Sequence, residues 1–173
     1  MTDGRLSAIW RYPVSSLDGE RLDHAAATPR GIEGDRVVSL YDAETGAVAA
    51  PGREKRWRPA TTVYSRYNHG AAEVSVDRQT WSQGEDAAAV LTRHFGFPVE
   101  LREHGRPDAP PLYNRAPLHL VTTASLRRLH AIIPDSQIDV RRFRANLVVD
   151  LGTETTSWNR RGSAANSASV PPS

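Results

Sequence analysis

The residues best suited to chemistry lie in the segment 139–150, which contains three arginines and an asparagine within six positions. Its branched and aromatic residues favour a β-strand, because such side chains pack well on a pleated surface. Successive side chains of a strand point to opposite faces, so Arg142, Arg144 and Asn146 would share one face. Arg presents its donors in a planar fork that fits phosphate or carboxylate. The spacing predicts an anion clamp, or equally a solvated face of ion pairs.

Hydroxyl side chains gather at the start of a predicted helix just before this segment. Thr122, Thr123 and Ser125 lie where the first helical turn presents unpaired N–H groups, which favour anions. If this turn and the arginine segment converge, they would hold a phosphate between them. The alternative is that Thr122 or Thr123 only caps the helix. Arg36 opens an earlier predicted strand and would either reach the same pocket or pair with a neighbouring carboxylate such as Asp35.

Several kinds of catalytic and metal site are excluded by composition. The chain has no cysteine, which rules out disulfides, thiolate metal sites and a cysteine nucleophile. Its six histidines include no pair at the helical i, i+4 spacing of a metal site. His119 lies in a predicted strand and is either a core or a pocket residue. No nucleophile elbow, Walker loop or dinucleotide-binding glycine motif is present.

Charge and hydropathy argue against nucleic-acid and membrane partners. The net charge is +2 and the isoelectric point is about 9.3, with Lys55 as the only lysine. Arg53–Arg58 is the one local basic cluster, whereas a nucleic-acid footprint needs a continuous basic stripe. No apolar run approaches the ~20 residues that span a bilayer, and no signal-peptide segment is recognisable at the N-terminus. We therefore expect a cytoplasmic protein whose partner is a small molecule.

Short strands dominate the predicted elements, and two helices interrupt them. A Ser82–Glu85 capping box opens the first helix and Gly96 ends it, while Pro134 follows the second. Strands without regular helix alternation favour the mainly β (α+β) class, with a barrel-like fold and two peripheral helices. Strands are predicted at 6–14, 21–27, 35–42, 61–67, 72–76, 99–102, 117–122 and 139–150.

Composition also suggests where the chain divides. The proline-rich connector at 104–111 is the best candidate boundary, so we expect an N-terminal β-barrel-like region at 1–103 and a second region at 104–151. The stretch 152–173 is rich in Ser, Ala, Asn and Pro, and such a composition buries too little apolar surface to fold alone. We expect it to be a disordered or divergent tail.

Four separated motifs, in order, resemble the MOSC family, which includes relatives of the C-terminal domain of molybdenum cofactor sulfurases and of the amidoxime-reducing components. The resemblance covers about residues 5–150. It implies that 1–103 is the MOSC N-terminal β-barrel region and that 104–151 is the start of the MOSC domain. The motifs are Trp10–Gly19, Gly31–Arg36, Ala116–Leu126 and Asp139–Asn146.

What the resemblance implies is a pocket for molybdenum cofactor (molybdopterin), whose pterin carries a phosphate. The family's other associations, molybdenum-ion and pyridoxal phosphate binding, oxidoreductase activity and a redox partner protein, are implied in the same way. The positions that match cofactor-contacting residues of the relatives are Ser16, Arg36, Ser125, Arg144 and Asn146. Together with Thr123 and Arg142 from strand parity and helix capping, they form the candidate cofactor-binding set.

The chain also departs from the family pattern. Ser15 stands where relatives often have lysine, and Ala145 replaces a proline. The cysteine that ligates the metal in relatives is absent, and no residue here supplies the soft thiolate that molybdenum prefers in this cofactor. The segment 160–173 looks like a truncated or frame-shifted end. Three functions remain open. The first is a molybdenum cofactor-dependent oxidoreductase or sulfur-transfer protein, and the second is a non-catalytic MOSC-fold module that binds a phosphorylated small molecule or nothing. The third, ranked last, is an interaction or structural β-barrel.

Overall fold

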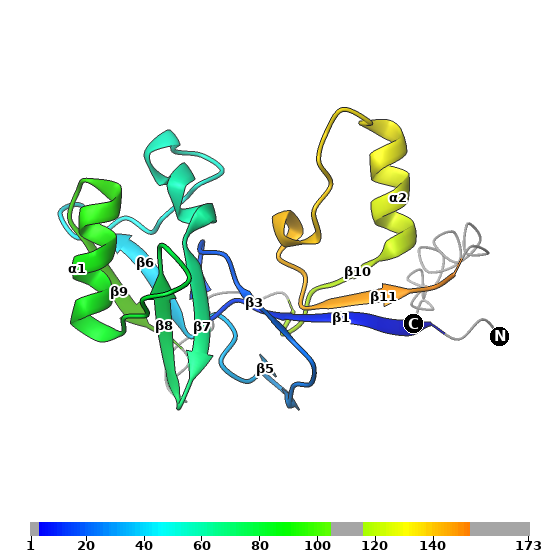
Figure 1. Ribbon diagram of the computed structural model, residues 1–173, viewed down its shortest axis with the longest axis horizontal. Coiled ribbons are helices and arrows are strands. Elements are labelled where there is room, and N and C mark those ends of the chain that lie inside the picture. The colour runs from blue at the N-terminus through cyan, green and yellow to red at the C-terminus, as the bar shows by residue number, and fades with distance from the viewer. Residues whose placement is uncertain (1–3, 105–115, 153–173) are drawn as a thin grey trace, which may run out of the picture.

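The structure is a computed structural model that describes residues 4–104 and 116–152. These residues form two lobes, and the division between the lobes does not follow the gap in the numbering. Figure 1 shows α1 (Gly84–Phe95) in one lobe and α2 (Thr123–Ile132) in the other. Strands outnumber helices, which are two α-helices and two short 3-10 helices among the described residues. The expected α+β class, rich in strands, is confirmed. The connector at 105–115 and the stretch 153–173 lie outside the described residues.

The first sheet brings together segments from both ends of the described chain. Its order is β10-β11-β1-β3, with β1 antiparallel to both of its neighbours and β10 parallel to β11. The Ser7 hydroxyl donates to the carbonyl of Val148, 141 positions later, over 3.0 Å. The regions 1–103 and 104–151 therefore share one sheet. Its strands are β1 (Arg5–Arg11), β3 (Glu20–Leu22), β10 (Leu120–Thr122) and β11 (Leu147–Asp150).

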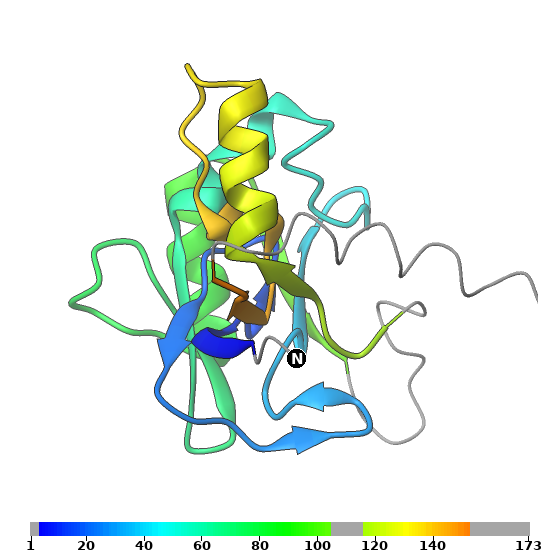
Figure 2. The ribbon, with the colours of Figure 1, turned by 90° about the vertical axis from the view of Figure 1, so that its right-hand side faces the viewer.

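The other strands form three small sheets. A three-stranded sheet has the order β2-β6-β9, β7 and β8 form a hairpin, and β4 pairs with β5. Figure 2 shows the β4–β5 arm at the opposite end of the molecule from the tip of α2. The strands are β2 (Val14–Ser15), β4 (Ala27–Thr28), β5 (Gly31–Ile32), β6 (Val38–Asp42), β7 (Tyr64–Asn68), β8 (Ala71–Ser75) and β9 (Val99–Glu103).

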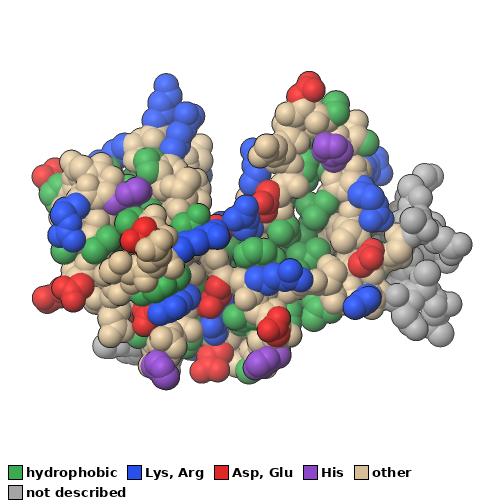
Figure 3. Space-filling view, viewed as in Figure 1, with side chains coloured by type: hydrophobic (Ala, Val, Ile, Leu, Met, Phe, Trp, Pro, Cys, Tyr) green, Lys and Arg blue, Asp and Glu red, His purple; other side chains and the backbone are tan. Residues whose placement is uncertain are grey.

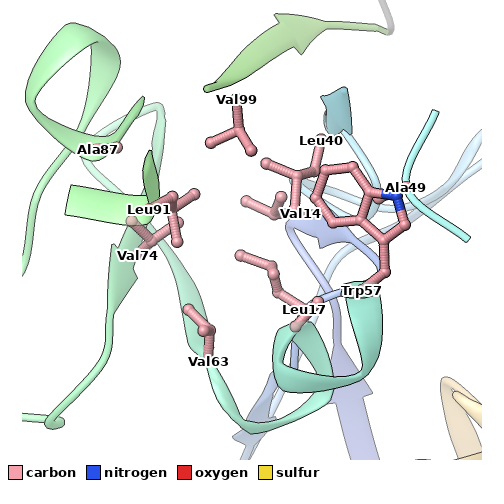
Figure 4. Close-up of a cluster of buried hydrophobic side chains, with 11 residues drawn as sticks. Val14, Leu17, Leu40, Ala49, Trp57, Val63, Val74, Ala87, Leu91 and Val99 are labelled. Atoms are coloured by element: carbon pink, nitrogen blue, oxygen red, sulfur yellow. The ribbon is translucent and has the colours of Figure 1, made fainter. Parts of the chain in front are cut away.

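The main hydrophobic core lies in the lobe that contains α1. Figure 4 shows Leu17 and Leu40 facing the indole of Trp57, while Leu91 of α1 closes the opposite side. Trp57 comes from the 3-10 helix η1 (Lys55–Thr62), is fully buried, and meets the ring of Phe97 edge-on at 4.8 Å. Such aromatic pairs add about 0.5–1.5 kcal/mol beyond the area they bury. This core fixes η1 above the strands.

The two helices begin and end at residues that the sequence partly identifies. Gly96 ends α1 in the left-handed conformation (φ 77°), and the Thr122 side chain caps α2 by accepting from the Ser125 N–H. The predicted Ser82 cap is wrong: Gln83 is the N-cap of α1, because Ser82 is held in a β-bridge with Val74.

The sheets that the structure describes do not close into a barrel. The first sheet ends at β10 on one side and β3 on the other, and the remaining strands pair in separate sheets of three and two. The described residues form a strand-rich α+β arrangement in which β1 and β11 extend away from the core lobe.

The strand predicted over 139–150 is wrong in its first half. Residues Val140–Phe143 form a 3-10 helix, η2, and only Leu147–Asp150 form a strand. The Asp139 carboxylate accepts from the Arg141 N–H at 2.8 Å, and a local bond of this kind competes with a strand ladder. Arg144 then adopts a left-handed conformation (φ 52°), so the predicted sharing of one strand face does not apply.

No helix of the described residues is both long and apolar enough to cross a bilayer. The longest α-helix, α1, has 12 residues, against the ~20 that a span requires. This agrees with the absence of an apolar run in the sequence.

We expect Leu91→Ala to lower the free energy of unfolding by about 2–5 kcal/mol, because the fully buried side chain leaves a cavity between α1 and the core strands. The matched control is Leu120→Ala, at a side chain 51% exposed, which should cost less than about 0.5 kcal/mol. Urea denaturation of both variants measures the difference. Equal losses would contradict the placement of the core.

Candidate functional site

Tyr12 lies at the centre of a cluster formed by distant segments. Its ring is fully buried, with the guanidinium carbon of Arg144 at 4.4 Å from the ring centroid and that of Arg36 at 5.4 Å. Arg36 Nη2 donates to the Arg144 carbonyl over 2.8 Å, across 108 positions of the chain. We call Tyr12, Arg36, Arg144 and Asn146 the arginine joint.

Arg36 is positioned by the turn that follows β5. Gly34 (φ 77°) lies so close to the Tyr67 ring that a Cβ would come within 2.4 Å of it, so this turn requires glycine. The Asp35 carboxylate accepts from the Tyr12 N–H at 2.8 Å, and the Arg36 N–H donates to the Tyr12 carbonyl at 2.8 Å. The turn is thereby fixed to the end of β1. The Arg36 guanidinium forms an ion pair with the Asp35 carboxylate, as one of the two alternatives from the sequence predicted, and it also reaches Asn146 Oδ1 at 3.3 Å.

Asn146 is completely buried and every polar group of it is bonded within the protein. Its Oδ1 accepts from the His119 N–H (3.2 Å) and from Arg36 Nη1 (3.3 Å), and its Nδ2 donates to the Trp10 carbonyl (3.2 Å). Its backbone N–H donates to the His119 carbonyl at 2.7 Å, and its carbonyl accepts from the Trp10 N–H at 2.8 Å. Asn146 therefore connects β1, the segment before β10, and the turn carrying Arg36.

Arg144 is held by a tight turn at Val14–Asp18, which we call the Ser16 turn. Its guanidinium donates to the carbonyl of Leu17 and, over 3.3 Å, to that of Val14. On the other side of this turn, the Ser16 hydroxyl donates to the Ala49 carbonyl at 3.1 Å. The Ser16 turn is thus placed between Arg144 and the segment that leads into η1.

Three of the predicted site residues have an unusual backbone. Ser16 (φ 74°), Arg36 (φ 52°) and Arg144 (φ 52°) are left-handed without being glycine, and among the described residues only His69 and Arg78 share this property. Such conformations cost about 1–3 kcal/mol each and concentrate at ligand clamps and switch regions. Three of the five non-glycine residues with a left-handed backbone among the described residues therefore lie in the arginine joint and the Ser16 turn.

Arg141 is a site residue that sequence reasoning missed. It donates to the Asp18 carboxylate at 3.1 Å and forms a closer pair with Asp139, so η2 is anchored to the Ser16 turn. The hydrogen bonds from Arg141 lower the pKa of Asp139 below its usual range, and the same pairing raises the pKa of Arg141. The signal that could have found it is the Asp-x-Arg pattern, in which the aspartate caps a turn and fixes the arginine.

Burial raises the pKa of Tyr12 to about 12, against the opposing effect of the Arg144 guanidinium. The phenol therefore stays protonated at neutral pH and does not act as a base. Its hydroxyl has no hydrogen-bond partner among the described residues.

The other predicted residues lie apart from the joint. The Thr123 hydroxyl donates to the Asp150 carboxylate at 2.7 Å, and Ser125 is bonded to Thr122 at the helix cap, through side chain and backbone. Arg142 is exposed and donates to the Gln137 carbonyl at 2.9 Å. The structure thus brings Arg36, Arg144 and Asn146 together, with Ser16 on the adjoining turn.

A notch opens above the Ser16 turn, between η1 and η2. Figure 3 shows it as a deep hollow between two projections, with Lys and Arg side chains at the tip of one projection and along the base. The η1 side carries the exposed cations Arg53, Lys55 and Arg58, and the η2 side carries Arg141 and Arg142. Cations on two walls create a field that attracts anions, and Arg141 contributes least to it because it is paired with Asp18 and Asp139.

Neither metal ligands nor a known relative identifies the site. Among residues 4–104 and 116–152, no three His, Asp or Glu side chains form a group that could hold a metal ion, and the chain has no cysteine. No protein-family model matches the chain, and no curated protein sequence matches it either. The function of the site must therefore follow from its own geometry and charge.

We expect Asn146→Ala to lower the free energy of unfolding by at least about 2 kcal/mol, because it removes a fully buried amide and the hydrogen bonds that this side chain forms with His119, Arg36 and Trp10. Asn68→Ala is the matched control, since Asn68 makes one long hydrogen bond to Glu73 (3.3 Å) in a partly exposed hairpin. Guanidinium denaturation compares the two. A cost for Asn146→Ala no larger than for the control would show that the joint is not structural.

Arg141→Gln should raise the pKa of Asp139 toward its ordinary value, because the charged hydrogen bonds that lower it are lost. Since the folded-state pKa of Asp139 lies below its unfolded value, its contribution to stability is present above about pH 4 and lost as the pH falls through the folded-state pKa. NMR titration of the side-chain carboxyl carbon measures the shift. Asp150, whose pKa is lowered mainly by Thr123, should titrate unchanged in the same sample.

Proposed function

We propose that this chain is a MOSC-like module that binds a phosphorylated small molecule in the notch above the Ser16 turn. The barrel-like MOSC arrangement, with the N-terminal region at 1–103 and the start of the MOSC domain at 104–151, is part of the same proposal. Its base in the sequence is the ordered set of motifs that supplies Arg36, Arg144 and Asn146.

The observation that carries the proposal is the meeting of Arg36 and Arg144 against the Tyr12 ring. They come from separate motifs, 108 positions apart, yet are linked by a direct hydrogen bond of 2.8 Å. The Arg144 guanidinium is fixed by the carbonyls of Leu17 and Val14. The Arg36 guanidinium is fixed by the Arg144 carbonyl and by the Asp35 carboxylate, which offsets part of its charge, so both groups are held at the base of the notch without reorganisation. Preorganised charge of this kind is what an anion-binding site requires.

The walls of the notch add to this charge. Lys55 and Arg58 stand on η1, and Arg53 lies in the turn just before it. This turn is connected to the Ser16 turn, because the Ala49 carbonyl accepts from the Ser16 hydroxyl and the Ala50 carbonyl accepts from the Arg53 N–H at 2.9 Å. A phosphate monoester, which carries about two negative charges near neutral pH, suits such a surface. The left-handed backbone at the base is consistent with a clamp maintained for a ligand.

The residues present do not fit the molybdenum of the implied cofactor. The metal of this cofactor takes a thiolate, and the chain supplies none. We therefore derive no redox or sulfur-transfer step and propose no redox partner. A pterin that carries a phosphate remains one possible ligand of the proposed class, phosphorylated small molecules, because the arginine joint and the notch would bind the phosphate group and not the metal.

The prediction is that flavin mononucleotide, a planar ring system with one phosphate, binds at least tenfold more tightly than riboflavin, which lacks the phosphate. Arg144→Lys should weaken flavin mononucleotide binding about tenfold, because lysine keeps the charge but loses the planar fork. Arg102→Lys, at an exposed arginine on β9, is the matched control and should leave binding unchanged. Fluorescence titration at low salt measures four dissociation constants: those of the wild type for flavin mononucleotide and for riboflavin, and those of the two variants for flavin mononucleotide.

Two outcomes would contradict the proposal. Equal affinity for the phosphorylated and unphosphorylated flavin would show that the notch does not recognise phosphate. Stoichiometric molybdenum in protein purified from cells that make the cofactor would show that the conclusion drawn from the missing thiolate is wrong.

A further inference from the structure

A second hollow, distinct from the notch, lies between the first sheet and α2. It has a volume of about 770 Å³, and we call it the α2 groove. Its floor is formed by Ala8, Trp10 and Val148 of the sheet, and its walls by Leu126 of α2 and the connector 134–140. Figure 3 shows hydrophobic side chains at the bottom of this hollow. A volume of this size falls within the range of small-molecule sites, about 300–1,000 Å³.

The groove is unusual because protein interiors are normally closely packed. No residue of α2 is fully buried, although the helix carries Leu126, Leu129 and Ile132. Ile132 is 68% exposed, and Ile133, directly after the helix, is 41% exposed. The helix and the connector therefore arch over the sheet without filling the space beneath them.

Trp10 provides a rigid platform at the floor. Its backbone N–H donates to the Asn146 carbonyl and its own carbonyl accepts from Asn146 Nδ2, so the backbone is held on both sides. The indole N–H is buried and has no hydrogen-bond partner among the described residues. Its indole stacks near the Tyr12 ring, with an angle of 18° between the planes and 6.4 Å between the centroids. An indole on a fixed backbone, stacked near a second ring, favours an aromatic ring as its contact partner.

Charges at the rim of the groove balance one another. The rim carries one positive side chain, Arg21, and one negative side chain, Asp135. The Asp139 carboxylate is already paired with Arg141. His130 is an exposed side chain on the same rim. The rim therefore offers no net charge to an ionic ligand, whereas the floor offers apolar contact.

We propose that the α2 groove binds an uncharged, planar, aromatic small molecule on the Trp10 platform. This site does not depend on the phosphate site in the notch. Its ligand class is different, because the notch has arginines at its base and cations on its walls, whereas the groove has apolar side chains under a charge-balanced rim.

Two naphthalene probes of nearly the same shape test the proposal: N-phenyl-1-naphthylamine, which is uncharged, and 1-anilinonaphthalene-8-sulfonate, which is an anion. The expected result is saturable one-to-one binding of the uncharged probe at pH 7.5, at least tenfold tighter than that of the anion. Ala8→Phe fills the floor and should abolish binding, while Ala43→Phe, at an exposed position on the other lobe, should not. Circular dichroism checks that both variants fold.

Energy transfer locates the bound probe. Trp10→Phe should remove most of the tryptophan-sensitised probe emission, whereas Trp81→Phe, in the β8–α1 loop, should leave it nearly unchanged. If Ala8→Phe fails to fold, Leu126→Gln on α2 replaces it and should weaken binding of the uncharged probe at least fivefold. Unsaturable binding, equal affinity for the two probes, or sensitised emission that depends on Trp81 and not on Trp10 would overturn the proposal.

Discussion

The hydrogen bonds around Asn146 are the constraint on which the rest of the described structure depends. A fully buried amide has to satisfy its donors and acceptor internally, because an unpaired buried polar group costs about 1–3 kcal/mol. Here the partners are Trp10 of β1, the backbone of His119 and the guanidinium of Arg36. One side chain therefore fixes the pairing of β1 with β11, the approach of β10 and the turn after β5.

This constraint also determines what the arginines can do. Arg36 and Arg144 donate to backbone carbonyls on segments far away in the sequence, so they stabilise the fold while holding two guanidiniums beside one aromatic ring. The Asp35 carboxylate pairs with Arg36, so Arg144 supplies the larger share of the positive charge. An anion site built on such residues needs little reorganisation, which suits recognition of phosphate. It also means that substitutions at these arginines change both folding and binding, so exposed arginines elsewhere are the proper controls.

Local signals in the sequence predicted much of the secondary structure. The end of α1 at Gly96, the cap of α2 at Thr122 and the β7–β8 hairpin follow from short-range rules. The segment 139–146 failed because its apolar residues suit a strand, whereas the Asp139 side chain stabilises a 3-10 turn locally. The pairing of β1 with β11 and the left-handed Arg144 depend on contacts more than 100 residues apart, which periodicity does not encode. Arg36, Arg144 and Asn146 lie together in the structure, but through a left-handed turn and not through a shared strand face. Arg142 and Thr123, which the sequence grouped with them, bond elsewhere.

A double-mutant cycle between Arg36 and Asn146 tests the central claim most directly. The free energy of unfolding is measured for the wild type, Arg36→Ala, Asn146→Ala and the double variant. If the two side chains act as one hydrogen-bonded joint, the coupling energy should exceed about 1 kcal/mol, because each single substitution already removes the shared interaction. Additive losses, within about 0.3–0.5 kcal/mol, would contradict the account, since they would mean that Arg36 and Asn146 stabilise their own segments independently.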